Sequence, residues 1–220
     1  TLFIGDVGRP DLLASVGVTA DDLARQLFAS LHNKLLLLPD DTMVYPAHGA
    51  GSSCGKQLST ETVSTIGEQR RTNYALAAMV IDDFVDVVTE GQNVAPMYFP
   101  FAAYRNREAR PLLDDDAPLV EISAPEAVAL AATGAVIIDS RDDQSFALGH
   151  IRGSVNVGLS GRFAEYVGEV MKPGTAIVIV SDAGFEREAR TRLARIGFDN
   201  VLGCISNPIQ EMLQHPELVE

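Results

Sequence analysis

The chain has 220 residues, of which 46% are hydrophobic, a composition that allows a globular protein to bury a sizeable core. Its formal net charge of −13 argues against nucleic acids and anionic membrane surfaces as partners, because both bind basic patches. Its apolar runs are far shorter than the ~20 residues of a membrane span, and its two cysteines are too few for a disulfide scaffold. A cytoplasmic location is therefore expected.

The first residues predict a strand, a polar loop and a helix. Residues 1–4 are a short apolar run, and the loop 5–11 is rich in glycine and acidic residues. Thr19 and Asp22 form a Thr-x-x-Asp pattern resembling a capping box, so a helix should begin there. Because the chain opens inside a strand-like run, we expect the natural gene product to be longer. The helix presents an apolar stripe to a core, made of Leu23, Leu27, Leu31 and Leu35.

Further elements are predicted in the rest of the first half. Residues 43–45 form a brief strand that leads into a Pro-Ala-His-Gly loop at 46–49. A helix should begin near Thr65. Another should span residues 81–89 and end before Gly91, because glycine is the usual residue after a helix terminus.

The composition changes at residues 109–118, which contain an Arg-Pro pair and a run of aspartates. Such a stretch predicts a linker, so we place one domain at 1–108 and another at 119–220. Continuous apolar runs in the second domain fit strands buried on both faces of a parallel sheet, which predicts an α/β fold. The runs are 136–138 and 176–180, and helices are expected at 123–132, 162–171 and 186–196.

A group of motifs in the second domain resembles the rhodanese family. Asp139 and Arg141 form an aspartate–arginine turn after an apolar run, and residues 149–154 match the family's GHI-x-G segment. Residues 197–201 match its last strand, so the resemblance covers about residues 119–206. We expect Asp139, Arg141 and His150 to form a structural hydrogen-bond set that holds the loops.

The sulfur-carrying loop departs from the rhodanese pattern. Rhodaneses use a cysteine in a C-x-x-G-x-R frame, and aligning Gly184 places Ser181 at the cysteine and Glu186 at the arginine. A serine hydroxyl cannot hold a persulfide as a thiolate does, and Asp182 and Glu186 would repel an anionic sulfur donor. We therefore expect no sulfurtransferase activity, with Ser181 as an N-cap or turn residue. Cys204 is expected to be a small buried residue, with a relocated nucleophile as the alternative.

Three segments of the first domain resemble the metallo-β-lactamase fold, in the branch of glyoxalase II and the persulfide dioxygenases. They are residues 1–12, 44–49 and 64–74. The resemblance implies the C-terminal part of an αββα fold, followed by the rhodanese domain. It also implies that the family's metal-binding aspartate and other histidines precede Thr1, whereas His48 takes the position of the last histidine. One histidine cannot hold a catalytic metal, since such sites use at least three protein ligands.

Other polar residues of the first domain are candidates for binding. Arg9 and Asp11 belong to a G-R-x-D loop that lies near the active-site mouth in the resembling enzymes. Arg9 could bind a carboxylate or sulfur anion of a thiol substrate, or it could brace the loop against Asp11. Asp6 is expected to be a polar loop residue rather than a metal ligand, and Cys54 receives no role.

These features lead to three hypotheses. The first is a metal-dependent enzyme on a small thiol or persulfide, such as a glutathione derivative. Persulfide oxidation at Fe(II) is preferred, with a zinc-dependent thioester hydrolase as the rival. The second is a non-catalytic binding or dimerisation module, which a self-complementary contact forming a homodimer would favour. The third is residual sulfur transfer on Cys204.

Overall fold

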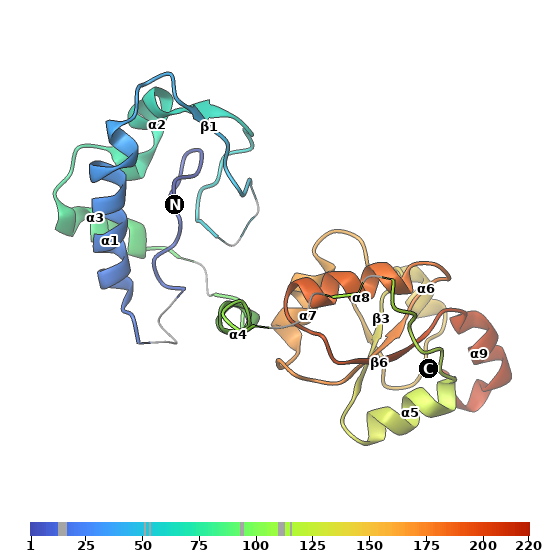
Figure 1. The fold of residues 1–220 in the computed structure, drawn as a ribbon. Helices are drawn as coiled ribbons and strands as arrows, with labels where there is room; N and C mark the ends of the chain where they lie inside the picture. Colours follow the sequence, from blue (N-terminus) through green and yellow to red (C-terminus); the bar gives the residue numbers. More distant parts are fainter. Residues whose placement is uncertain (13–16, 51, 53, 93–94, 110–112, 115) are drawn as a thin grey trace. The chain divides into compact units, whose positions relative to one another are not determined.

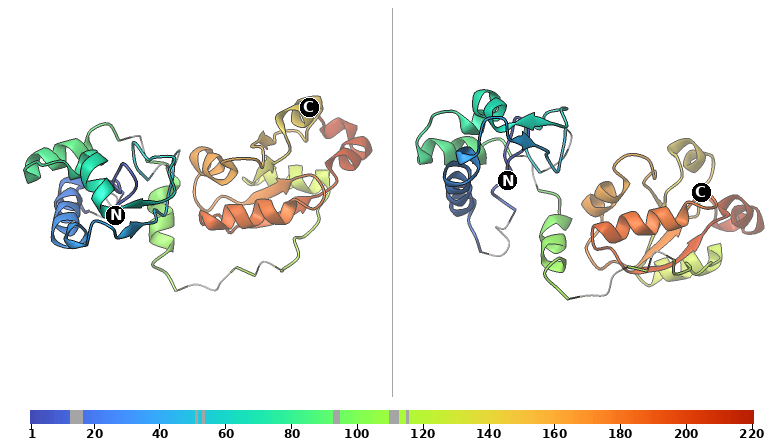
Figure 2. Two further views of the ribbon diagram at one scale, coloured as in Figure 1. Left: turned by 90° about the horizontal axis from the view of Figure 1, so that it is seen from above. Right: turned by 45° about the horizontal axis from the view of Figure 1, so that its top comes forward.

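The computed structural model describes residues 1–12, 17–50, 52, 54–92, 95–109, 113–114 and 116–220. They form two compact units, Thr1–Ala95 and Pro96–Glu220, each with a core of its own (Figures 1 and 2). This division lies before the stretch 109–118 at which the sequence placed a linker. Residues 110–112 and 115 of that stretch lie outside the described residues.

Helix α4, Tyr98–Arg105, explains why the boundary between the two units lies before the charged stretch. Tyr98 is 7% exposed and shares the core of the second unit with Phe163 and Phe198. The sequence alone places residues 96–108 in the first domain, because they precede the charged stretch. The helix belongs to the second unit because Tyr98 is buried in that core and Phe99 and Ala102 pack against it.

The first unit packs α1 against α3, beside a two-stranded antiparallel sheet. Leu27 and Leu31 of α1 share one core with Phe84 and Val88 of α3. In chain order its elements, with η for a 3-10 helix, are α1 (Ala20–Asn33), η2 (Leu35–Leu37), β1 (Met43–Val44), β2 (Ser64–Thr65), α2 (Ile66–Thr72), η3 (Tyr74–Leu76) and α3 (Ile81–Thr89).

Side-chain caps confirm two of the predicted helix starts in the first unit, and α3 begins at Ile81 as predicted without such a cap. Thr19 accepts a hydrogen bond from the Asp22 N–H at 3.1 Å and begins α1. Thr65 accepts from the Glu68 N–H at 3.1 Å and begins α2. Leu35, placed on the first helix by its four-residue spacing, instead begins η2, because α1 ends at Asn33.

The strand expected at residues 1–4 is wrong. This segment is one arm of a tight turn, in which an antiparallel bridge joins Leu2 to Val7. Gly5 adopts φ +76°, a left-handed conformation that glycine reaches without strain. The apolar run predicted an extended strand, but the glycine that follows it lets the chain reverse.

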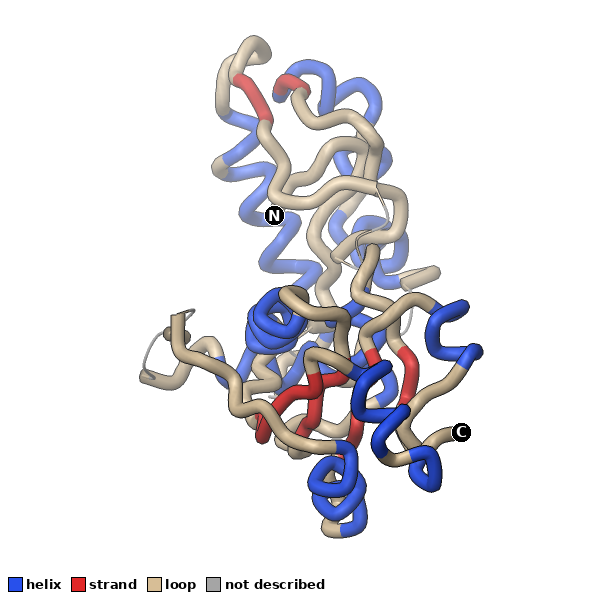
Figure 3. The backbone as a smooth tube through the Cα atoms, turned by 90° about the vertical axis from the view of Figure 1, so that its right-hand side faces the viewer, coloured by secondary structure: helices blue, strands red, loops and turns tan. Residues whose placement is uncertain are grey.

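The second unit is an α/β domain around a parallel sheet, as the sequence predicts. Within the described residues the sheet has four strands in the order β4-β3-β5-β6 (Figure 3). Its elements are α4, α5 (Ala124–Ala132), β3 (Val136–Asp139), α6 (Asp143–Leu148), β4 (Val155–Asn156), α7 (Phe163–Val170), β5 (Ile177–Val180), α8 (Glu186–Arg195), β6 (Val201–Ile205), α9 (Pro208–Gln214) and η4 (Pro216–Leu218).

Helices cover both faces of this sheet (Figure 1). On one face, Val167 of α7 and Leu193 of α8 share a core with Ile138 and Ile179. On the other face, side chains of α5 and α9 meet the alternate strand residues, because successive side chains of a strand point to opposite sides. These include Ala124, Ala127, Ile137, Val178, Val180 and Met212.

Local signals fix the ends of other elements. Ser123 and Glu126 form a complete capping box at the start of α5. The resemblance places residues 197–201 in the last strand, but the chain turns at Gly197, where φ is +83°, and β6 begins at Val201. Within the described ranges, none of the helices has the length and apolar character that crossing a bilayer requires.

Candidate functional site

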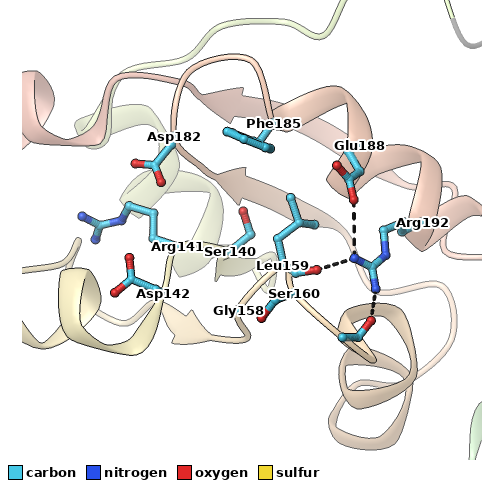
Figure 4. A pocket seen from close by; sticks show the side chains of 11 residues that line it. Ser140, Arg141, Asp142, Gly158, Leu159, Ser160, Asp182, Phe185, Glu188 and Arg192 are labelled. Carbon is cyan, nitrogen blue, oxygen red and sulfur yellow. Dashed lines mark hydrogen bonds and ion pairs between the residues drawn. The ribbon is translucent and has the colours of Figure 1, made fainter.

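The carboxyl ends of β3 and β5 meet at one edge of the parallel sheet, the place where sites form in open α/β folds. The loops that follow these strands border a cavity of about 490 Å³, which we call the β3–β5 hollow (Figure 4). It is lined by Ser140, Arg141, Asp142, Gly158, Leu159, Ser160, Gly161, Asp182, Phe185, Glu188 and Arg192.

Ser181, at the position of the rhodanese cysteine, serves the backbone of its own loop. Its side chain is buried, and its hydroxyl donates to the Asp182 carbonyl at 3.1 Å. Its N–H donates to the Ile205 carbonyl at 3.1 Å, which ties the loop to β6. Of the two roles expected for Ser181, the turn role fits these contacts, because α8 begins further on, after Phe185.

Glu186, at the position of the rhodanese arginine, folds back onto the same loop. Its carboxylate accepts a hydrogen bond from the Gly184 N–H at 2.8 Å. Successive backbone N–H groups in such a loop form a concavity that binds anions. Here one of those N–H groups already holds a carboxylate of the protein itself, so the loop has less capacity for an external anion.

Asp139 and Arg141 form a buried ion pair at the end of β3. The Arg141 guanidinium donates to the Asp139 carboxylate at 2.6 Å, and their side chains are 3% and 0% exposed. Arg141 also donates to the Gly149 carbonyl at 3.0 Å. The guanidinium therefore holds two loops together, and these contacts fit the structural role expected from the sequence.

His150 completes this set of contacts. Its Nδ1 lies 3.1 Å from the Phe146 carbonyl oxygen, and its ring stacks on the Phe146 ring with centroids 3.7 Å apart. Its backbone exchanges two hydrogen bonds of 2.9 Å with Glu220. His150 thus links α6 to the C-terminal segment, again in a structural role.

Carboxylates dominate the charge of the β3–β5 hollow. Arg192 donates to the carbonyls of Leu159 and Gly161 and lies 3.5 Å from Glu188, so its charge is engaged within the wall. Asp142 caps α6 by accepting from the Ser145 hydroxyl and N–H, and these hydrogen bonds lower the pKa of its carboxyl. The hollow is therefore poorly suited to an anionic sulfur donor.

Sequence reasoning named Arg141 and Asp182 but missed most of the other residues that line this hollow. The i,i+4 pair of Glu188 and Arg192 was visible in the sequence as charge patterning on a helix. The loop at 158–161 gave no comparable signal, because only the parallel pairing of β4 with β3 brings it to this edge.

Cys204 lies in the interior of β6 and is fully buried. Its thiol donates to the Glu121 carboxylate at 3.5 Å. Burial, and after it the negative charge of Glu121, raises the pKa of Cys204 to about 12. A thiol in this environment stays protonated near neutral pH, which opposes the relocated nucleophile considered from the sequence.

In the first unit, Asp6 is fully buried and holds three segments together. Its carboxylate accepts from the backbone N–H groups of Lys56 and Gln57, both at 2.7 Å, and from the Tyr74 hydroxyl at 2.7 Å. Burial and the Asp6 charge raise the pKa of Tyr74. Asp6 is thus a structural loop residue, as expected.

Arg9 and Asp11 brace their loop with two hydrogen bonds. Arg9 Nε and Nη2 each lie 2.7 Å from a different oxygen of Asp11, and the Arg9 side chain is 1% exposed. The hydrogen bond from Arg9 is the largest cause that lowers the pKa of Asp11. This geometry favours the brace over substrate contact. The Arg9 N–H also donates to the Cys54 carbonyl at 3.2 Å, so Cys54 contributes its backbone to the same loop.

His48 is exposed and meets the Phe3 ring edge to face, with centroids 5.6 Å apart. Among the residues that the structure describes, His, Cys, Asp and Glu side chains do not gather in groups of three or more that could hold a metal ion. The residues described therefore do not by themselves fit a catalytic metal site. Metal binding by His48 stays a prediction.

Comparison with known proteins shows what the second unit is. The family model for the rhodanese-like domain matches residues 123–206. Thiosulfate sulfurtransferase GlpE from Pseudomonas entomophila is 32% identical over 80 residues, which are 36% of this chain and 72% of that protein. The chain belongs to the rhodanese family.

The similarity extends beyond that domain. A metallo-β-lactamase structure from Staphylococcus aureus is 28% identical with a TM-score of 0.76, and the match covers 94% of this chain and 56% of that one. A β-lactamase hydrolase-like protein from Agrobacterium fabrum is 39% identical over 74 residues, 34% of this chain and 16% of that protein. The chain is a fusion of a metallo-β-lactamase-fold unit with a rhodanese domain, and it spans little more than half of the S. aureus chain.

Proposed function

We propose that the protein is an enzyme of the metallo-β-lactamase superfamily that oxidises a small persulfide, such as glutathione persulfide. One observation carries the proposal: a unit of that fold is joined in the same chain to a domain whose relative is named a thiosulfate sulfurtransferase. A thiol derivative is the expected substrate because the relative of the second unit acts on a sulfur compound and the first unit resembles the persulfide dioxygenase branch. A cytoplasmic location belongs to the same proposal, because both cysteines are free thiols and a reducing compartment preserves them.

The proposed reaction needs a metal, for which Fe(II) is the first expectation and zinc the second. His48 alone stands at a ligand position by resemblance, and catalytic sites use at least three protein ligands. In the first unit, the contacts of Asp6 and the Arg9–Asp11 pair fix the loop beside Phe3. We propose that these residues position the His48 segment rather than take part in chemistry.

We propose further that the rhodanese domain does not transfer sulfur. Ser181 replaces the thiol, and its hydroxyl is hydrogen-bonded to the adjacent backbone. Glu186 occupies an N–H of the loop, and the hollow beside it is lined by the carboxylates of Asp142, Asp182 and Glu188. A persulfide carrier needs a thiolate and a positive surrounding, and this loop supplies neither. We therefore propose that this domain has a binding role instead of sulfur transfer.

The deciding experiment measures the metal content of the protein expressed from its full natural reading frame, followed by oxygen uptake with glutathione persulfide. About one iron per chain with persulfide-dependent oxygen uptake supports the proposal. About two zinc ions per chain with thioester hydrolysis would replace it with the hydrolase alternative. Protein without bound metal would overturn both and leave a binding or dimerisation module.

A matched pair of histidine variants tests whether a loss of activity is specific to His48. His48→Ala should lower oxygen uptake by about tenfold or more, since residues next to a metal tune its ligands. His215→Ala, in the second unit beside Glu217, should leave it unchanged. Equal losses in the two variants would exclude a special role for His48.

A further inference from the structure

A second cavity adjoins the β3–β5 hollow. It has a volume of about 560 Å³, lies beside the edge strand β4, and shares Asp142, Gly158 and Ser160 with the first cavity. The two cavities therefore adjoin at the loop that contains Gly158. We call the pair the acidic groove.

The acidic groove exposes apolar side chains along its length. Phe185 is 52% exposed in the first cavity, and Tyr166 and Val170 are 48% and 64% exposed in the second. Val155, on the edge strand, is 42% exposed. Exposed apolar side chains that gather in a groove with a polar rim mark interaction sites, because burying them against a partner is favourable.

The charge that the groove offers to a partner is negative, because the arginines around these side chains are engaged within the protein. Arg141 and Arg192 are bound within the wall, and Arg162, whose guanidinium lies over the Tyr166 ring, pairs with Glu165. In Figure 4, carboxylates flank Phe185 on both sides. Glu188 lies 3.5 Å from Arg192, and the other carboxylates that line the groove are Asp142, Asp143, Glu169 and Asp182.

We propose that the acidic groove binds a basic segment of a partner protein, with arginine or lysine side chains against the carboxylates and apolar side chains against Phe185 and Tyr166. Charge complementarity selects this occupant. A second copy of this chain is a poor occupant, because its net charge is −13. The inference goes beyond the proposed persulfide reaction and does not depend on it.

The test uses a fluorescent synthetic peptide of alternating arginine and leucine, titrated with the whole protein and followed by anisotropy. Two further peptides carry glutamate in place of arginine, or serine in place of leucine. We expect the arginine–leucine peptide to bind, the glutamate peptide to fail, and the serine peptide to bind at least several-fold more weakly. Equal binding of the first two peptides, or of the first and third, would overturn the proposal.

Variants locate the binding on the protein. The double variant Asp182→Asn with Glu188→Gln should weaken binding about fivefold to tenfold, and Phe185→Ser should weaken it comparably. The control is Asp41→Asn with Glu61→Gln, which removes the same charge from exposed side chains that do not line the groove.

The control distinguishes a site from the general attraction of an acidic protein. An equal loss in both double variants would overturn the groove, as would full binding by the groove variants. Circular dichroism melting shows that each variant is folded. Binding is measured without thiol substrate or added metal, so its failure leaves the proposed reaction standing, and a failed oxygen-uptake assay leaves the groove standing.

Discussion

Among the residues that the structure describes, each unit buries one carboxylate completely, but the two carboxylates are satisfied in different ways. In the first unit, Asp6 accepts from neutral donors, three backbone N–H groups and the Tyr74 hydroxyl. In the second unit, Asp139 faces the charged guanidinium of Arg141 at 2.6 Å. In both cases the carboxylate holds a loop that the sequence marked as a possible site.

The difference lies in how far the contacts reach along the chain. Arg141 lies two residues from Asp139, so this pair forms wherever its turn forms. Asp6 accepts one hydrogen bond from the neighbouring Val7 N–H, but its other partners lie 50 to 68 residues away, so those contacts exist only when the first unit is folded. A local pair is visible in the sequence as a motif, whereas a long-range network is not.

The largest effect is expected from removing one half of the charged pair. Arg141→Leu leaves the buried Asp139 carboxylate without its cation and should lower the free energy of unfolding by about 3–5 kcal/mol. Urea unfolding followed by circular dichroism measures this. Asp139→Leu combined with Arg141→Met should recover most of the loss, because an apolar pair leaves no uncompensated charge. A single variant as stable as the parent would show that the pair contributes little.

Loss of the neutral network should have a smaller effect. Asp6→Ala leaves the N–H groups of Lys56 and Gln57 without their acceptor and should cost about 2–3 kcal/mol. Tyr74→Phe removes one of the donors and should cost about 1 kcal/mol. Hydrogen exchange at Lys56 and Gln57 should quicken in the Asp6 variant. Unchanged protection at both amides would contradict the role given to this carboxylate.

The Arg9–Asp11 brace should contribute a modest pH dependence. Because the folded pKa of Asp11 lies below its usual value of 3.8, its stabilisation is present above that value and is lost as pH falls through the folded pKa. The partly exposed pair should contribute no more than about 1 kcal/mol. Arg9→Gln should reduce the dependence of the melting temperature on pH between neutral pH and about pH 2. An unchanged acid slope in that variant would mean that other carboxyls cause it.

The smallest expected change is a gain of activity in the rhodanese loop. Ser181→Cys alone should stay inactive in a thiosulfate:cyanide assay, because Glu186 still holds the Gly184 N–H. Ser181→Cys with Glu186→Arg supplies a thiol and a cation and should show weak activity. Activity of the unaltered protein equal to that of the double variant would disprove the inactive-domain proposal.

Much of the fold followed from local patterns in the sequence. The continuous apolar runs at β3 and β5 predicted buried parallel strands, the Thr19 cap predicted the start of α1, and the helix starts expected near Thr65 and Ser123 agree with α2 and α5. The rhodanese resemblance placed Asp139, Arg141 and His150 in structural roles that their contacts fit. These features depend on residues close together in the chain, so periodicity and motif spacing contain them.

Tertiary structure alone decided the rest. It showed that Gly5 reverses the first segment and that α4 packs with the second unit. It also folded Glu186 onto its own loop and brought the loop after β4 to the edge of β3 and β5. Each outcome depends on which surfaces a segment buries and which distant donors reach it. The sequence contains that information only through the packing of the whole unit, because burial and long-range hydrogen bonds are properties of the folded chain.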